Sequence, residues 1–471
     1  MLSRFLAPGL GLLLLCTFAL LYRVDYAVYI HALDAYGAAP YRFPFVDIFT
    51  NLAALDCTRN GVDVYVANPC DVVGWRYNYS PLLLLGAQLP IGRSATLAFG
   101  LALDLLFLAS LTLLPPPRRL AEQALRVAVT LSSATVYGLE RANLDLFLFA
   151  LAVAGASLLA KSGRVRLLGY PLLLLAAVIK YYPVVTLLVM AKERRRVFVW
   201  VAGGCGAVLA AFFAVYHHDI ARSLGQVPGG VYFAEGFGAV NLPRGLAQLV
   251  LSAPSLAIWR QGLGDTLLLA FALWTLFRAR RWVLDADLRD RFASLAEAER
   301  MPLVVGALVL VGCFFAAQNI YYRAVFILMT LPGLLALTRP DGEPKRDAAA
   351  ASLFRRLAPT LLVMTWGEVV RHQLVSRTEP PSGLTGLWRA ADLAFWLVRE
   401  VAWWNFIAIL AAILWWFARQ SPLLPRARLW RFAAIRRGDA SNPTLGSDGA
   451  GQLEMNRARC DGTISDAALS E

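Results

Sequence analysis

The stretch "VIKYYPVV", residues 178–185, lies inside a run that is otherwise leucine, alanine and valine. Lys180 places an ammonium group in apolar surroundings, where an unpaired charge is costly. Pro183 has no amide hydrogen to continue a helix and therefore interrupts one. The pattern indicates an interrupted apolar segment with a charge that needs a partner or a ligand.

The whole chain shares this apolar character. Of its 471 residues 58% are hydrophobic and 16% are charged, and the mean hydropathy is +0.56. Apolar runs recur along the chain, many approaching the ~20 residues that cross a bilayer as a helix. The composition therefore predicts an all-α, polytopic integral membrane protein. The first run, 6–22, has no small-residue cleavage site close behind it and is interpreted as an uncleaved span.

The basic residues indicate the orientation of the spans. The net charge is +13, but the Lys and Arg residues fall between apolar runs or in the tail, as in cytoplasmic loops of membrane proteins. Membrane topology therefore explains the charge, and no nucleic-acid partner is expected. The clusters expected to face the cytoplasm are 118–119, 161–166, 192–196, 278–281, 339–356 and 419–437.

This orientation predicts that the stretch 178–185 is the turn of a hairpin. Only 25 residues separate Arg166 from Lys192. If both ends face the cytoplasm, 167–191 forms two short helices that turn at the Lys180–Pro183 motif. The alternative is a single long span, which would place 161–166 outside.

With the hairpin the layout has about twelve spans, within a range of 10 to 14. Residues 1–420 form the membrane domain, with extracytoplasmic loops 23–79 and 217–263 and a short one near 373–390. Residues 421–471 form a cytoplasmic tail, basic at first and then polar and expected to be disordered. The expected spans are 5–22, 80–114, 121–138, 143–160, 167–179, 183–191, 197–216, 264–279, 302–318, 324–338, 357–372 and 391–417.

The first outer loop is rich in aspartate and aromatic residues and contains no lysine. In this topology Cys57 and Cys70 are the cysteines that lie outside both the membrane and the cytoplasm. They are either two free thiols or, in an oxidising compartment, a disulfide worth ~3 kcal/mol. The four histidines form no recognisable ligand set, so neither a metal nor a cofactor is expected.

Three short polar turns interrupt apolar hairpins on the same outer side: "GLERANLD" (138–145), "IKYYP" (179–183) and "QNIYYR" (318–323). Arg141, Lys180 and Arg323 from these turns are expected to line a cationic cavity that binds a lipid-linked phosphate, because such groups form short charge-assisted bonds to phosphate oxygens. The alternative is that each cation merely extends to the lipid headgroups. The neighbouring amides expected to contact substrate are Asn143, Gln318 and Asn319.

Four segments carry a resemblance to a known family: "VDIFTNLAALDCTRNGVDVY", "YNYSPLLLL", "RANLDLFLFAL" and "AAVIKYYPVVTLL". Over residues 46–190 the chain resembles the polyprenol-phosphate-sugar-dependent glycosyltransferases of the GT-C superfamily. The most similar type is glycosyltransferase family eighty-seven, which includes phosphatidylinositol-mannoside mannosyltransferases. The chain departs from the family pattern at Ser80, at Ala142 and at the Tyr322-Arg323 pair.

The resemblance implies roles for residues of the first outer loop. It assigns the catalytic base to Asp47, 14 residues before Gly61. Asp25, in "DYAVY" just after the first span, is the second candidate for that aspartate. Substrate contacts are implied for Asp63 and Tyr65 of the Gly-x-Asp-x-Tyr motif and for Tyr79 of the Tyr-x-Pro motif.

The implied reaction is the inverting transfer of a hexose, such as mannose, from a polyprenyl phosphate to a lipid or glycan acceptor. It would occur on the extracytoplasmic face of the plasma (inner) membrane. Two alternatives remain in other classes: a polytopic transporter or flippase of a lipid or small solute, and a ligase or polymerase of lipid-linked glycans. A purely structural scaffold would leave the acidic outer loop unexplained.

Overall fold

The computed structural model describes residues 2–38, 41–227, 229, 232–233, 236–342, 344–376 and 385–424. The tail expected to be disordered lies outside the described residues from 425 on, as does the middle of the expected loop 373–390. The α-helices and the 3₁₀ helices (η) are α1 Leu2–Val24, α2 Tyr26–Ala35, α3 Val46–Arg59, α4 Pro81–Leu84, η1 Leu85–Gln88, η2 Arg93–Ala95, α5 Thr96–Ser110, η3 Leu111–Leu113, α6 Leu120–Thr130, α7 Ser133–Arg141, α8 Leu144–Leu159, η4 Arg164–Leu168, α9 Gly169–Ile179, η5 Tyr182–Lys192, α10 Arg195–Gly225, α11 Asn241–Val250, η6 Pro254–Leu256, α12 Ala257–Leu284, α13 Ala286–Ser294, α14 Glu297–Ala316, η7 Tyr321–Phe326, α15 Ile327–Leu337, α16 Pro344–Ser376 and α17 Thr385–Arg419.

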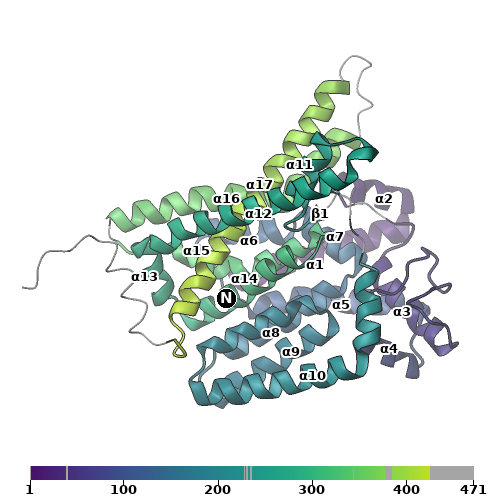
Figure 1. Cartoon of the computed structure of the whole chain (residues 1–471), viewed down its shortest axis with the longest axis horizontal. Helices are drawn as coiled ribbons and strands as arrows, with labels where there is room; N and C mark the ends of the chain where they lie inside the picture. The colour runs from purple at the N-terminus through teal and green to yellow at the C-terminus, as the bar shows by residue number, and fades with distance from the viewer. Residues whose placement is uncertain are drawn as a thin grey trace, which may run out of the picture. The chain divides into compact units, whose positions relative to one another are not determined.

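The fold is almost wholly helical, as the composition predicts (Figure 1). Six helical segments in the described part of the chain are long and apolar enough to cross a membrane, or seven if the bent pair α7–α8 is one span. In the apolar stretch of α10 only 6% of the residues are buried by the rest of the protein. Such apolar surface suits a lipid environment, so these helices indicate a membrane protein.

Several expected spans have other bounds in the structure. The expected helix 80–114 is divided into α4, η1, η2, α5 and η3, and the expected helix 121–138 is broken between α6 and α7. Helices also occupy the expected outer loops, with α2 and α3 in the first and the end of α10, α11 and the start of α12 in the second. Apolar composition shows where a chain is buried or meets lipid, but it does not reveal these breaks.

Helix α14 lies at the centre of the packing (Figure 1). Its apolar side chains are mostly buried, and it contacts α8, α15, α17 and η5. The two strands, β1 (Gly236–Phe237) and β2 (Asn319–Ile320), form an antiparallel pair with Gly236 opposite Ile320. This pair connects the segment before α11 to the polar turn that follows α14.

Residues 167–191 form the hairpin that the charge pattern predicts. Helix α9 ends at Ile179, Lys180 is extended, and η5 begins at Tyr182 and packs back against α9. The ends meet, because the Arg166 guanidinium donates to both oxygens of the Glu193 carboxylate, at 3.1 and 2.9 Å. A single long span would hold these two residues far apart, so the alternative is wrong.

A cluster of ion pairs gathers around the start of α14. Arg339 donates to Glu122 at 2.7 Å and to Glu299 at 2.5 Å, and Lys192 lies 3.6 Å from Glu297. Three of the basic segments expected to face the cytoplasm, near 118, 192 and 339, therefore meet at one end of this helix. The three polar turns (138–145, 179–183 and 318–323) lie at the other ends of the helices that these basic segments flank.

Candidate functional site

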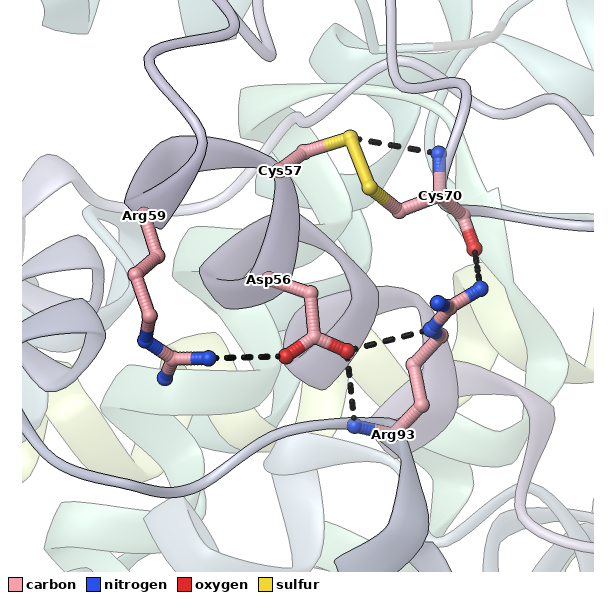
Figure 2. The surroundings of a disulfide bond; sticks show 5 residues. All are labelled: Asp56, Cys57, Arg59, Cys70 and Arg93. Atoms are coloured by element: carbon pink, nitrogen blue, oxygen red, sulfur yellow. Dashed lines mark hydrogen bonds and ion pairs between the residues drawn. A yellow bond between two sulfur atoms is a disulfide. The ribbon is translucent and has the colours of Figure 1, made fainter.

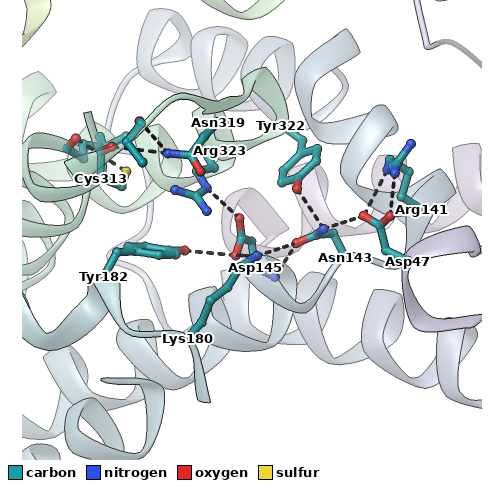
Figure 3. A network of polar contacts seen from close by, with 12 residues as sticks. Asp47, Arg141, Asn143, Asp145, Lys180, Tyr182, Cys313, Asn319, Tyr322 and Arg323 are labelled. Carbon is teal, nitrogen blue, oxygen red and sulfur yellow. Dashed lines mark hydrogen bonds and ion pairs between the residues drawn. The ribbon is translucent and has the colours of Figure 1, made fainter. Parts of the chain in front are cut away.

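The three polar turns converge with the start of α3 on one buried set of polar contacts (Figure 3). Each side chain comes from a helix end or a break, where the backbone leaves its regular course. We call this set the Asp47–Asp145 network. It consists of Asp47 from the first turn of α3, Arg141, Asn143 and Asp145 from the bend between α7 and α8, Lys180 from the break between α9 and η5, and Arg323 from η7.

Asp47 lies at one end of the network and is 4% exposed. The Arg141 guanidinium donates two hydrogen bonds to its carboxylate, from Nη2 to Oδ1 at 2.5 Å and from Nε to Oδ2 at 3.0 Å. Asn143 Nδ2 donates to the same Oδ2 at 2.5 Å. Such bidentate, charge-assisted bonds fix both the position and the orientation of a carboxylate.

Asp145 lies at the other end and is 1% exposed. Its Oδ1 accepts from Lys180 Nζ at 2.6 Å and from the Tyr182 hydroxyl at 3.0 Å, and its Oδ2 accepts from Arg323 Nε at 3.1 Å. Two cations thus share one buried carboxylate. Residue 145 was not among the predicted site residues, although a carboxylate in an apolar span is itself a signal of function.

Asn143 joins the two halves of the network. Its amide nitrogen donates to Asp47 and to the Tyr322 hydroxyl at 3.0 Å. Its amide oxygen accepts from the Asp145 backbone at 2.9 Å, capping α8, and faces Lys180 Nζ at 3.4 Å. A side chain with one acceptor and two donors is needed to make these contacts, which explains an asparagine at this position.

Aromatic rings face all three cations. The Arg141 guanidinium carbon lies 5.0 Å from the Tyr41 ring centre, 5.5 Å from that of Trp75 and 5.3 Å from that of Tyr137. Tyr79 faces the Lys180 ammonium at 5.3 Å. Cation–π contacts of this kind stabilise charges that have lost part of their water. They place Tyr79, which was predicted from the resemblance, beside the network.

Arg323, the third cation, also has a cation–π contact. The Tyr182 ring centre lies 4.3 Å from the Arg323 guanidinium carbon. Tyr182 thus contacts Arg323 with its ring and Asp145 with its hydroxyl. Neither Tyr182 nor Tyr322 was predicted as a site residue, although both lie in the polar turns. One sequence does not show which tyrosine of each Tyr-Tyr pair faces the cations.

The backbone is strained at two points beside the network. Phe45 (φ 67°), just before α3, and Ala142 (φ 44°), between α7 and α8, are the non-glycine residues with positive φ in the described part of the chain. The Phe45 amide donates to the Glu140 carbonyl at 2.6 Å, and α7 and α8 meet at an angle of 111°. Left-handed conformations cost energy in residues with a Cβ and concentrate at functional sites.

The network carries an excess of positive charge. Arg141, Lys180 and Arg323 give three positive charges, against two negative charges from Asp47 and Asp145. Burial makes an unbalanced charge costly, so an arrangement of this kind favours an anionic ligand. Lys180, whose side chain is 16% exposed, is the most accessible of the three cations.

The Gly-x-Asp-x-Tyr motif lies outside the network. Asp63 forms an ion pair with Arg222 near the end of α10, and the Tyr65 ring centre lies 5.0 Å from the guanidinium carbon. The hydrogen bond from Arg222 lowers the pKa of Asp63, which is half-exposed. The structure therefore separates these two predicted substrate contacts from Asp47.

The two amides of the last polar turn take part in backbone and loop contacts. Gln318 Nε2 donates to Asn241 Oδ1 at 2.9 Å, which ties the turn to the start of α11. Asn319 Nδ2 donates to the Ala317 carbonyl at 2.8 Å. Asn319 lies at the margin of the network, near Arg323, rather than within it (Figure 3).

The second candidate for the base has a structural role. Asp25 accepts hydrogen bonds from the backbone amides of Ala27 and Val28, at 2.9 and 3.1 Å, and so caps α2. Its side chain is exposed. Asp47 caps no helix, although it lies in the first turn of α3. Geometry thus favours Asp47 over Asp25 as the aspartate with a chemical role.

Cys57 and Cys70 form a disulfide at the far end of α3 (Figure 2). Beside it, Asp56 pairs with Arg59 and Arg93, each at 3.0 Å, and Arg93 also donates to the Cys70 carbonyl. Although burial raises the pKa of Asp56, the hydrogen bonds from Arg93 and Arg59 outweigh it and lower that pKa. The bridge fastens the chain that leads to Trp75 and Tyr79 onto the helix that carries Asp47.

Among the residues that the structure describes, no group of three or more His, Cys, Asp or Glu side chains is placed to hold a metal ion. Comparison with known proteins adds no relative: no family model, curated protein or solved structure matches the chain.

Proposed function

We propose that this protein is a membrane glycosyltransferase. It moves a hexose, mannose-like in the family that the sequence resembles, from a polyprenyl phosphate to a lipid or glycan acceptor. The observation that carries the proposal is the convergence of three cations from three separate polar turns with Asp47 in one buried network. The proposal also rests on the resemblance to GT-C enzymes of family eighty-seven. It includes about twelve membrane spans and an extracytoplasmic site in the plasma membrane.

The network has the groups that this reaction requires. The acceptor oxygen bonds to the anomeric carbon as the bond from that carbon to the phosphate oxygen breaks. The electron pair of the broken bond goes to the phosphate, and the acceptor proton goes to Asp47. Lys180 and Arg323 stabilise the departing phosphate. One in-line displacement inverts the configuration at carbon 1, and phosphate leaves without a general acid.

A transporter or flippase is the second candidate. The bend of 111° between α7 and α8 beside buried charges is also typical of the broken helices that bind substrates in transporters. The two candidates differ in their products, because only a transferase makes a new glycosidic bond. A ligase or polymerase of lipid-linked glycans differs from the proposed enzyme in its acceptor.

The test uses the purified full chain in nanodiscs, with radiolabelled polyprenyl-phosphate hexoses and a lipid extract as acceptor. We expect labelled glycolipid or glycan, and a loss of turnover of ~10² to 10⁴-fold in Asp47→Asn, the usual contribution of a positioned base. Asp25→Asn, which removes an exposed charge but leaves an oxygen that can cap α2, and Asp56→Asn are the matched controls and should keep most of the activity.

Two results would contradict the proposal. Full activity in Asp47→Asn, or a larger loss in Asp25→Asn, would show that the base is another residue. Movement of labelled donor across proteoliposomes without any new glycosidic product would identify a transporter.

A further inference from the structure

The structure shows an Asp47 carboxylate whose lone pairs are mostly occupied by hydrogen bonds. Three N–H groups donate to its two oxygens, two from Arg141 and one from Asn143, and the residue is 4% exposed. A general base must offer a lone pair to the hydroxyl that it deprotonates. A carboxylate has about four lone-pair sites, and these bonds leave one, on Oδ1, which itself accepts from the Arg141 guanidinium. The guanidinium therefore restricts the approach of an acceptor hydroxyl to this buried carboxylate.

Arg141 has a geometry that suits a second anion equally well. Its Nε and Nη2 form one flat fork, and both point at Asp47 (Figure 3). A phosphate group accepts from such a fork in the same bidentate way as a carboxylate. The rings of Tyr41, Trp75 and Tyr137 surround the guanidinium and maintain its position. The third nitrogen, Nη1, faces the Tyr137 hydroxyl at 3.4 Å. Asp47 and a phosphate that enters the network would therefore compete for the Nε–Nη2 side of the guanidinium.

We propose that Arg141 is a latch, in which the guanidinium holds Asp47 when the site is empty and releases it when a polyprenyl phosphate takes the fork. This inference rests on the proposed function. The buried guanidinium keeps a counter-ion in both states, so neither state leaves it uncompensated. Asn143 still holds the freed Asp47 carboxylate, so the base stays oriented while it gains a free lone pair. The base becomes available only when a donor is present.

The latch predicts an unusual effect on affinity, which binding measurements test. Labelled polyprenyl phosphate without a sugar is the probe, and the full chain in nanodiscs is the receptor. Asp47→Asn removes the competitor of the phosphate and is expected to tighten binding at least about tenfold, within the coupling measured between close charge pairs. Arg141→Gln removes the fork and should weaken binding. In the double variant the gain from Asp47→Asn should vanish, leaving the affinity of Arg141→Gln.

The double variant separates the latch from a general effect of charge. Removing a negative charge would help any anion to bind, but that gain would persist without Arg141. A gain that persists in the Arg141→Gln background, or no gain in Asp47→Asn, overturns the latch. Asp47→Ser, also neutral, replaces Asp47→Asn if that variant fails to accumulate. Asp56→Asn, outside the network, should change affinity less than about twofold.

The same experiment separates this inference from the proposed function. If the wild type transfers sugar and binds polyprenyl phosphate but Asp47→Asn shows no gain, only the latch is wrong. If the wild type binds no polyprenyl phosphate, both the latch and the proposed function are wrong.

Discussion

Substitution of Asp145 tests whether the Asp47–Asp145 network excludes water and whether its ion pairs stabilise the fold. Asp145→Asn keeps the shape of the side chain but leaves Lys180 and Arg323, which now contact it at 2.6 and 3.1 Å, without their shared counter-ion. Removing one partner of a buried ion pair costs ~3–5 kcal/mol. The residue is 1% exposed, so solvent offers little compensation. We expect a loss of unfolding free energy in this range.

The assay is denaturant unfolding of the protein in mixed micelles, with Asp56→Asn as the matched control. Asp56 also pairs with two arginines, but their side chains are 39% and 45% exposed, and exposed pairs contribute ~0–1 kcal/mol. Adding Lys180→Met to Asp145→Asn should restore part of the loss, because it removes one uncompensated cation. Equal small losses in Asp145→Asn and Asp56→Asn would show that water reaches the network and that its ion pairs are not desolvated.

Three further predictions follow from other contacts. Lys180→Met should weaken polyprenyl phosphate binding by ~2–5 kcal/mol, measured with the labelled lipid; unchanged affinity in a folded variant would mean that Lys180 only pairs with Asp145 or the headgroups. Replacing Cys57 and Cys70 together by serine should lower the unfolding free energy by ~3 kcal/mol, and a reducing agent should destabilise the wild type but not this variant. A cysteine at Ser162, which is exposed and next to the turn at Gly163, should resist an impermeant thiol reagent in intact cells, and labelling there would reverse the expected orientation.

The sequence predicted the class of fold and the residues that meet at the site better than it predicted how they are paired. The hairpin at 167–191 followed from charge and length alone, because two basic ends and 25 residues leave few topologies. The convergence of Arg141, Lys180 and Arg323 followed from placing three polar turns on one side. Their ion pairs did not follow, because a sequence shows which charges are present but not which carboxylate reaches them.

The helix breaks were missed for a related reason. The expected span 80–114 is mostly apolar, and the signals of a break, Pro90 and Gly92, were given too little weight. The structure divides the span there, where Arg59 donates to the carbonyls of Ala87, Leu89 and Ile91, at 3.1, 2.7 and 2.8 Å. A long-range side chain that satisfies these carbonyls removes the need for a continuous helix. Only the tertiary structure reveals such a partner.

The level of the network along the helices bears on the choice between transferase and transporter. Helix α14 has 20 residues and is therefore ~30 Å long, close to the thickness of the hydrocarbon layer. The ion cluster of Glu122, Glu299 and Arg339 lies at its start, and the Asp47–Asp145 network lies at its other end, where Arg323 neighbours Cys313 of the last turn. Transporters usually bind substrate near the middle of the bilayer, on half-helices that point inward. A charged site at the level where the helices end favours instead a ligand with its phosphate at the membrane boundary and its chain in the apolar layer.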